Sequence, residues 1–581
     1  MLWRQKYKKN FMTTAIQSKK TIVDLKRICI FAAYILKKND MSFLGDFTTK
    51  VDSVGGSIWL SALVALIPIL YLFWALAIRK MKGYVAGLTT LLVAILSATF
   101  FFKMPAGMAI MISSYGAVYG FMPIGWIILT AVFLYKITVK TGQFEIIRSS
   151  IIAITDDRRL QAILIAFGFG AFLEGAAGFG APVVISAALL IGLGFKPLYA
   201  AGLCLIANTV PVAFGSVGIP ITTFGNFGYD VPAISAMVGR QLPLVSLFVP
   251  FYLVLVMVGW KKTKEVLPAI FVAGGTFAIV QFLSSNFIGP ELPDILSSLT
   301  SIVSLAVFLR FWKPKTVYYF KDEKPAEANT KIYTNRQILK AWSPFIVLTV
   351  MVSLWGIPQI KAILNDRTLT WIQDVPAVMG YLFNAAGNPT TLQYKIPFLG
   401  LAGTAVLISA IITKFIVGQS WIDFVKTFAE TCKEIALPLV TIMSVLALSN
   451  IANYSGMMLA LAATLAKTGA TFHFLSPVLG WLGVFITGSD TAANNLFGPL
   501  QFETAKNVAM NPILALAANA SGGVTGKMIS PQSIAVACAA VGLAGKESDL
   551  FRFTIKHSFI LLLIICVITF LQSNVLSFMV P

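Results

Sequence analysis

Long apolar runs alternate with short polar stretches along most of this chain. Such runs predict membrane-spanning helices, because about 20 apolar residues are needed to cross the hydrocarbon core of a bilayer. The third run is too long for one straight helix, and we expect it to break near Gly120 to Pro123. The pattern predicts an all-α polytopic membrane protein with about 12 spans, near residues 57–78, 83–102, 105–137, 197–222, 237–259, 266–283, 295–311, 341–357, 396–413, 434–453, 511–540 and 557–580.

Two further apolar segments, 160–195 and 475–503, are rich in Gly and small polar residues. Such a composition is typical of a re-entrant hairpin, since free backbone groups at membrane depth are tolerated only inside protein or beside a cavity. We therefore predict a hairpin at each segment. Each is followed by a helix that Gly and Pro interrupt, in 197–222 and in 511–540.

An internal repeat supports this arrangement. Phe172-Leu-Glu-Gly175 resembles Phe485-Ile-Thr-Gly488, and the stretch from Asn208 through Gly215 to Pro220 resembles that from Asn519 through Gly526 to Pro531, with equal spacing. Charge-based topology makes the first hairpin open from the cytoplasm and the second from outside. The sequence thus predicts inverted repeats, with a first membrane half at 41–311, a polar cytoplasmic linker at 312–340 and a second half at 341–581.

Composition agrees with the membrane class. Of all residues, 57% are hydrophobic and 12% are charged, whereas soluble domains carry about 25% charged residues. This excludes an ordinary soluble enzyme, a disordered regulator and a disulfide scaffold. The net charge of +21 would indicate nucleic acid in a soluble protein, but here the cations cluster between apolar runs. They indicate basic cytoplasmic loops in a bilayer, and no nucleic-acid partner is expected.

Residues 1–40 differ from the rest, with Lys8-Lys9, Lys19-Lys20 and Lys37-Lys38 and no run long enough to span. We expect this basic extension to lie outside the working protein, which would begin at Met41. The alternative is a basic tail that contacts anionic lipid.

Four breaks, in 168–182, 208–220, 487–499 and 519–531, place candidate chemistry near mid-membrane. Half-helix N-termini there suit a carboxylate, since their free N–H groups and dipole favour an anion. We expect Lys527 or Arg240 to supply the counter-charge, and Glu174 or Asp490 to carry a proton. An internal salt bridge between these charges is the alternative. Further substrate-binding candidates are Asn208, Thr209, Ser489, Thr491, Asn494 and Asn519, and the expected break glycines are Gly175, Gly178, Gly180, Gly215, Gly488 and Gly526.

Enzyme signatures are missing from the sequence. It has no Walker loop, no His-Glu-x-x-His helix and no Gly-x-Ser-x-Gly. With two histidines in all, we predict no metal site and no cofactor, and we do not expect an enzyme.

Several long and uncommon strings stand out along the chain: Gly170-Ala-Phe-Leu-Glu-Gly-Ala-Ala-Gly-Phe-Gly-Ala-Pro182 and the stretches 194–206, 284–294, 480–491 and 522–533. They closely resemble the bacterial L-lactate permease family, and the resemblance runs from about Gly56 to Pro581. The resemblance implies uptake of lactate, and often glycolate, with protons, in a bacterial cell membrane. A more distant likeness to ion-transporter superfamily carriers implies a scaffold and a moving transport domain.

The expected function is therefore uptake of L-lactate, with D-lactate and glycolate, by proton symport. Symport of lactate with one proton moves no net charge, so an inside-negative potential does not oppose it. Alternatives are a carrier for another small carboxylate, a sodium-coupled carrier and, from another class, an anion channel or membrane sensor. The sequence leaves open whether the chain forms a homo-oligomer.

Overall fold

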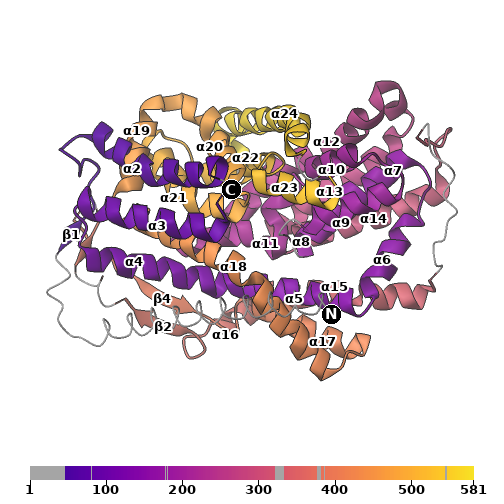
Figure 1. The fold of residues 1–581 in the computed structure, drawn as a ribbon, viewed down its shortest axis with the longest axis horizontal. Helices are drawn as coiled ribbons and strands as arrows, with labels where there is room; N and C mark the ends of the chain where they lie inside the picture. Colours follow the sequence, from indigo (N-terminus) through magenta and orange to yellow (C-terminus); the bar gives the residue numbers. More distant parts are fainter. Residues whose placement is uncertain are drawn as a thin grey trace, which may run out of the picture.

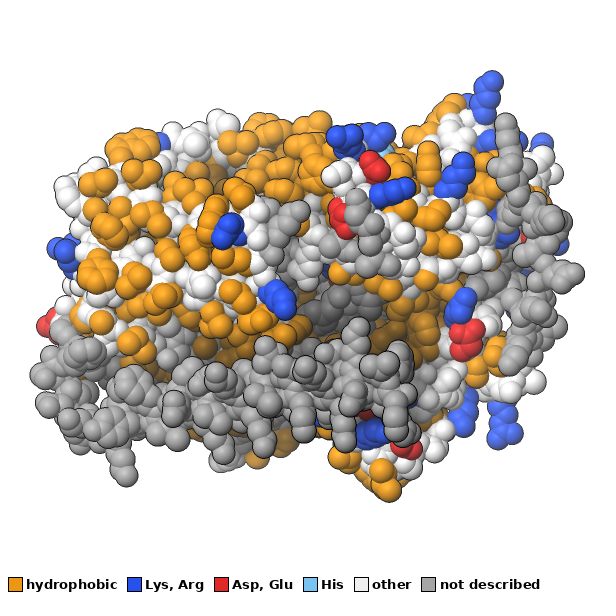
Figure 2. Space-filling view, in the orientation of Figure 1, with side chains coloured by type: hydrophobic (Ala, Val, Ile, Leu, Met, Phe, Trp, Pro, Cys, Tyr) orange, Lys and Arg blue, Asp and Glu red, His pale blue; other side chains and the backbone are white. Residues whose placement is uncertain are grey.

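The fold is a long assembly of helices with two very small sheets at its edge (Figure 1). The computed structural model describes residues 46–79, 81–176, 178, 181–320, 333–375, 378, 381–384, 387–543 and 546–581. The predicted basic extension at 1–40 lies outside these residues. Hydrophobic side chains cover much of the face seen in Figure 2, over α2 (Ile58–Phe73) and α3 (Gly83–Phe100), as expected for contact with lipid.

The first half of the chain continues beyond α3 with many short or broken helices. In order they are α4 (Ala106–Tyr119), α5 (Trp126–Lys140), α6 (Gln143–Ile152), α7 (Arg158–Ala162), α8 (Gly170–Ala176), α9 (Ala181–Gly192), α10 (Pro197–Ala207), α11 (Gly215–Thr222), α12 (Val231–Lys264), α13 (Leu267–Phe287) and α14 (Pro293–Phe311). Tighter or wider helical turns join several of them: η2 (Trp74–Ile78), η3 (Gly120–Gly125), η4 (Ile163–Phe169), η5 (Val212–Phe214) and η6 (Thr223–Phe227).

The second half holds α15 (Asn335–Gly356), α16 (Pro358–Leu364), α17 (Ala402–Val417), α18 (Trp421–Tyr454), α19 (Met457–Leu465), η7 (Ala466–Thr471), α20 (Phe472–Thr487), α21 (Asp490–Asn507), α22 (Pro512–Lys527), α23 (Pro531–Ala540), α24 (Glu547–Asn574) and η8 (Ser577–Met579). The sequence predicted no structure for 358–395. There, β2 (Trp371–Asp374) pairs with β4 (Gln393–Ile396), and β3 (Leu382–Phe383) pairs with β1 (Phe47–Thr48).

Within the described residues, nine helices are long and apolar enough to cross a membrane, or ten if the bent pair α10 and α11–η6 counts as one span. The membrane class is confirmed, but the predicted count of about 12 is not. Several predicted spans are shorter helices, such as α2 and α17. The break expected near Gly120 to Pro123 is present, since Met122 has extended dihedral angles (φ −131°, ψ 124°) between α4 and α5.

The order of elements repeats, as the sequence predicted. The series α3, α4–α5, α6, hairpin α7–α9, broken helix α10–α11 and α12 matches the series α17, α18, α19, hairpin α20–α21, broken helix α22–α23 and α24. The two halves pack into one another, because α18 of the second lies against α3, α4 and α5 of the first.

Glycines allow the closest helix contacts. A Cβ atom on Gly522 of α22 would overlap the carbonyl oxygen of Pro477 in α20, and one on Gly480 would overlap the carbonyl of Asn519. In the same way Gly116 and Gly120 let α4 lie directly on the α18 backbone. In lipid, such close approach supplies the dispersion contacts that hold helices together.

A buried ionic cluster fixes the start of the first hairpin. The guanidinium of Arg159 is fully buried and lies 2.7 Å from Asp157 Oδ2 and 2.8 Å from Glu265 Oε2. It also donates to the carbonyls of Lys262 and Thr316. The Thr316 hydroxyl, Arg159 and Lys262 donate to Glu265 and lower the pKa of its carboxyl to about 2, so Glu265 stays ionised at neutral pH. The cluster ties α7 to the α12–α13 turn and to the chain after α14.

We expect Arg159→Met to lower the melting temperature by several degrees. Removing one partner of a buried ion pair costs about 3–5 kcal/mol, since the remaining charge lacks compensation. Arg148→Met is the matched control, because its pair with Glu145 is exposed and such pairs contribute about 0–1 kcal/mol. Equal melting temperatures for the two purified variants would contradict this role for Arg159.

Candidate substrate site

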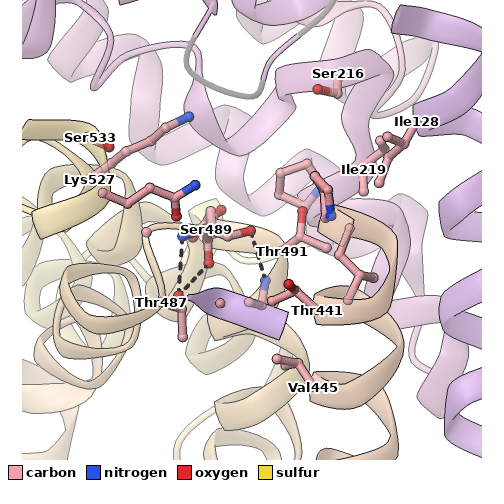
Figure 3. Close-up of a pocket in the computed structure, with 18 of the residues that line it drawn as sticks. Ile128, Ser216, Ile219, Thr441, Val445, Thr487, Ser489, Thr491, Lys527 and Ser533 are labelled. Atoms are coloured by element: carbon pink, nitrogen blue, oxygen red, sulfur yellow. Dashed lines mark hydrogen bonds between the residues drawn. The ribbon is translucent and has the colours of Figure 1, made fainter. Parts of the chain in front are cut away.

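A cavity of about 420 Å³ lies where the hairpins and broken helices meet α3, α5 and α18. One wall carries apolar and small groups, which include Gly83, Ile128 and Val445. The opposite wall is polar, and Figure 3 shows Lys527, Ser533 and Ser489 together on that side. Two lysines, Lys82 and Lys527, and two carboxyl side chains, Glu174 and Asp490, also line the cavity. The cavity therefore combines apolar surface with a few polar and charged groups, as a site for a small organic ion requires.

Two helices begin at the cavity. Ser489 is the N-cap of α21, and Gln532 lies in the first turn of α23. Gly215 and Ser216 also line the cavity, but Ser216 to Gly218 have left-handed dihedral angles, so α11 does not present a regular helix start there. The first N–H groups of a helix have no partner within it, and the helix dipole makes this end positive. Their convergence favours a bound anion.

Lys527 provides a full positive charge at the same wall. It is the last residue of α22, and its Nζ lies 2.6 Å from Glu174 Oε1 of α8. The other oxygen of Glu174 accepts a hydrogen bond from Asn208 Nδ2 at 3.0 Å. The Glu174 side chain is 3% exposed and that of Lys527 is 13% exposed, so the pair is buried but reaches the cavity. It joins the first hairpin to the second broken helix.

Asp490 is a second buried carboxyl on the wall, at the start of α21. Its Oδ2 accepts from Asn494 Nδ2 at 3.2 Å, while Oδ1 has no hydrogen-bond partner in the described part of the chain. Glu174 rather than Asp490 is thus the carboxylate in contact with Lys527.

Several predicted binding residues lie behind the wall instead of on it. Asn494 donates to the Pro220 carbonyl and accepts from Asn519, whose oxygen accepts from Gln501. This chain of amides fastens the second hairpin to α22 and α11. Asn208 is engaged by Glu174, and Thr209 is buried. None of Asn208, Thr209, Asn494 or Asn519 lines the cavity, whereas Ser489 and Thr491 do.

Arg240, the other expected counter-charge, is not among the residues that line the cavity. Its Nε donates to Asn286 Oδ1 at 2.9 Å and its Nη1 donates to the Met579 carbonyl at 2.7 Å. Arg240 therefore anchors the C-terminal residues against α12 and the end of α13. From the position of Arg240 in its apolar run, the sequence could not tell a counter-charge for a substrate from an anchor for the C-terminal residues.

The break glycines act in two ways. Gly178 and Gly488 have φ of 61° and 69°, a left-handed conformation that residues with a Cβ atom rarely adopt. Gly175, Gly215 and Gly526 instead allow close approach, to Asp294, Glu174 and the Trp481 carbonyl respectively. Gly180 lies outside the described residues.

The first broken helix also stores backbone strain, because Ser216 and Val217 are left-handed (φ 48° and 58°). The repeat that matches Gly215 with Gly526 sets Ser216 opposite Lys527, but the two residues do not hold equivalent positions in the structure. Ser216 follows the break of the first broken helix, whereas Lys527 precedes the break of the second. The helix before the break is 11 residues long in one repeat and 16 in the other.

Two polar residues near the site were missed. Asp294 is 1% exposed, touches the hairpin at Gly175, and neither of its oxygens has a hydrogen-bond partner among the described residues. Gln532 lines the cavity. Each directly follows a proline, Pro293 or Pro531, that begins a helix. Proline is favoured at the first helical position, so a polar residue after it was an available signal.

Comparison with known proteins gives the family. The family model described as L-lactate permease matches residues 61–576. The chain belongs to the L-lactate permease family. It is 59% identical to the L-lactate permease of Bacillus subtilis (strain 168) over 92% of this chain and 100% of that protein. It is 53% identical to the glycolate permease GlcA of Escherichia coli (strain K12), over 90% of this chain and 97% of that protein.

Among solved structures, the chain is similar to the YdaH transporter of Alcanivorax borkumensis (TM-score 0.44, 16% identity, 80% of this chain and 88% of that one). It is also similar to MtrF of Neisseria gonorrhoeae (TM-score 0.47, 13% identity, 85% and 94%). As a member of a permease family with multiple apolar helices, the protein is a multi-pass plasma-membrane transporter and not an enzyme.

The Lys527–Glu174 pair predicts a non-additive effect on stability. We expect Lys527→Met to lower the melting temperature, because it leaves the Glu174 carboxylate buried without a counter-charge. Adding Glu174→Gln should restore part of the loss, with a coupling of about 0.5–3 kcal/mol. Lys506→Met, which breaks an exposed pair with Glu503, is the control. Strictly additive shifts in the double variant would show that the two side chains do not interact.

Proposed function

We propose that this protein takes up L-lactate, with D-lactate and glycolate, by symport with protons. The observation that carries the proposal is the buried Lys527–Glu174 pair at a cavity where α21 and α23 begin. The curated relatives named L-lactate permease and glycolate permease support the substrate class. Lactate and glycolate are both small 2-hydroxycarboxylates, so one site with a fixed cation suits both.

The substrate carboxylate binds Lys527 in this proposal. An ammonium group has three donors, and one of those of Lys527 is directed to Glu174. An arriving carboxylate competes for the same charge, helped by the free N–H groups at the starts of α21 and α23. The apolar wall formed by residues such as Ile128 and Val445 accommodates the carbon chain.

Proton coupling follows from charge balance. Once lactate takes over Lys527, Glu174 is left buried with only the Asn208 amide as a partner. An ionised carboxylate in that position is expensive within a membrane protein, and binding one proton removes the cost. Lactate and one proton then enter together, so the loaded and empty sites carry the same charge. Asp490 is the second candidate for the proton, since it is buried at the same cavity.

The decisive experiment measures uptake of labelled lactate into proteoliposomes under an imposed pH gradient. We expect accumulation that follows the pH gradient and needs no sodium gradient. Accumulation that requires a sodium gradient would show that sodium, and not the proton, is the coupling ion. Downhill flux of lactate without accumulation would favour a channel. If other carboxylates compete more strongly than lactate and glycolate for uptake, the proposed substrate is wrong.

Lys527→Ala should abolish lactate binding by the purified protein. The substitution removes the ammonium group that the proposal places on the carboxylate, and charged hydrogen bonds of this kind contribute about 1.5–3 kcal/mol. Lys82 is the other lysine of the lining among the described residues. Lys527→Arg should impair binding less, because the charge is kept but a planar fork replaces a compact ammonium. Titration calorimetry gives the affinity, and a thermal melt confirms folding. Affinity within about twofold of wild type in folded Lys527→Ala would overturn the assignment.

Glu174→Gln should uncouple transport. The amide keeps the shape of the carboxyl but cannot bind the proton, so gradient-driven accumulation is lost while lactate exchange across the bilayer persists. Asp490→Asn and Asp294→Asn, which remove the other buried carboxyls, are measured in parallel. Normal accumulation by Glu174→Gln together with loss in Asp490→Asn would move the proton to Asp490.

A further inference from the structure

Most polar side chains on the cavity wall are already engaged within the protein. The Thr487 hydroxyl donates to the Gly483 carbonyl, the Ser489 hydroxyl caps the Ala492 N–H, and the Thr441 hydroxyl donates to the Leu437 carbonyl. The Ser533 hydroxyl accepts from Ser530. A substrate hydroxyl would have to compete with these bonds.

Gln532 differs from these groups. Its side chain is exposed at the cavity, and within the described part of the chain no hydrogen bond engages its amide. The carbonyl end of this amide lies against the tip of the second hairpin, where a Cβ atom on Gly488 would overlap Oε1. The Thr491 hydroxyl on the same wall is likewise without a partner there.

The position of Gln532 relative to Lys527 is fixed by a tight turn. The Ser530 N–H donates to the Lys527 carbonyl at 3.2 Å, and the Ser530 hydroxyl caps the first turn of α23 through the Ser533 N–H. Only a short turn therefore separates α22 from α23, and both side chains line one cavity. Figure 3 shows Lys527 next to Ser533, which follows Gln532 in α23.

We propose that Gln532 binds the 2-hydroxyl group of the substrate and thereby selects 2-hydroxycarboxylates over plain carboxylates. The inference rests on the proposed function, in which Lys527 holds the carboxylate. In a 2-hydroxycarboxylate the hydroxyl and the carboxylate are on adjacent atoms, so the hydroxyl partner must lie beside the cation. An amide oxygen accepts from the hydroxyl, and its NH₂ group can donate to the same hydroxyl or to the carboxylate.

Gln532 is favoured over Thr491 because its side chain is longer and carries both a hydrogen-bond donor and an acceptor. The glutamine side chain provides both an acceptor and a donor on a flexible stem, and its backbone N–H lies in the first turn of α23, without a partner inside the helix. Thr491 has one hydroxyl and follows Asp490, whose negative field opposes an anionic substrate.

The test compares two pairs of ligands that differ by the hydroxyl alone: L-lactate with propionate, and glycolate with acetate. Affinities are measured by titration calorimetry on the purified full-length protein. We expect Gln532→Leu to weaken the binding of L-lactate and of glycolate by about tenfold or more, as the loss of a hydrogen bond to a ligand does. The affinities for propionate and acetate should change by less than about threefold, so that the variant no longer prefers ligands with the hydroxyl group.

Gln373→Leu is the matched control, since Gln373 is an exposed residue of β2 remote from the cavity lining, and it should keep the wild-type preference. An unchanged preference in folded Gln532→Leu overturns the inference, as does loss of the preference in Thr491→Val alone. Failure of both Gln532→Leu and Gln532→Ala to fold would also overturn it, because Gln532 would then be structural. Wild-type protein that binds neither lactate nor glycolate would instead refute the proposed function.

Discussion

A buried charge needs a partner, and in this protein that constraint joins two parts of the chain. Lys527 ends α22 and Glu174 lies in α8, yet their charged atoms are 2.6 Å apart. Neither charge is stable alone at that depth. The pair therefore holds the first hairpin to the second broken helix. In the proposed function, a substrate carboxylate competes with Glu174 for Lys527, so the same contact would respond to the ligand.

The polar backbone around the pair is organised by the same rule. Helices that end within the membrane expose N–H and C=O groups, which must be satisfied by protein or face a cavity. Here the amide chain of Asn494, Asn519 and Gln501 supports the second hairpin from behind, and the starts of α21 and α23 face the cavity. Side chains that complete the scaffold are thus separate from those that remain available to a ligand.

This separation explains why the candidate residues fall into different classes. Every polar residue in a broken apolar segment costs free energy to bury. The sequence therefore identifies all of them as candidate site residues and cannot rank them. Asn208 serves the Glu174 carboxylate, Arg240 holds the C-terminal residues, and Ser489 caps a helix. Among the described residues of the wall, Gln532 and Thr491 keep unengaged polar groups, as does one carboxyl oxygen of Asp490. Availability of a donor or acceptor, rather than polarity, distinguishes a binding residue from a supporting one.

The sequence by itself determined the membrane class, the paired hairpins and broken helices, the kink before α5 and the presence of Glu174 and Lys527 as charges inside apolar segments. Each of these depends on local features: apolar run length, Gly and Pro at fixed positions, or a charge inside an apolar run. It did not determine the span count, the small sheets of 358–395, the burial of Asp294 or the remote position of Arg240. Those depend on which segments meet in space. Only the tertiary structure decided that Glu174 faces Lys527, because an ion pair between residues so distant in the chain is selected by packing and not by local pattern.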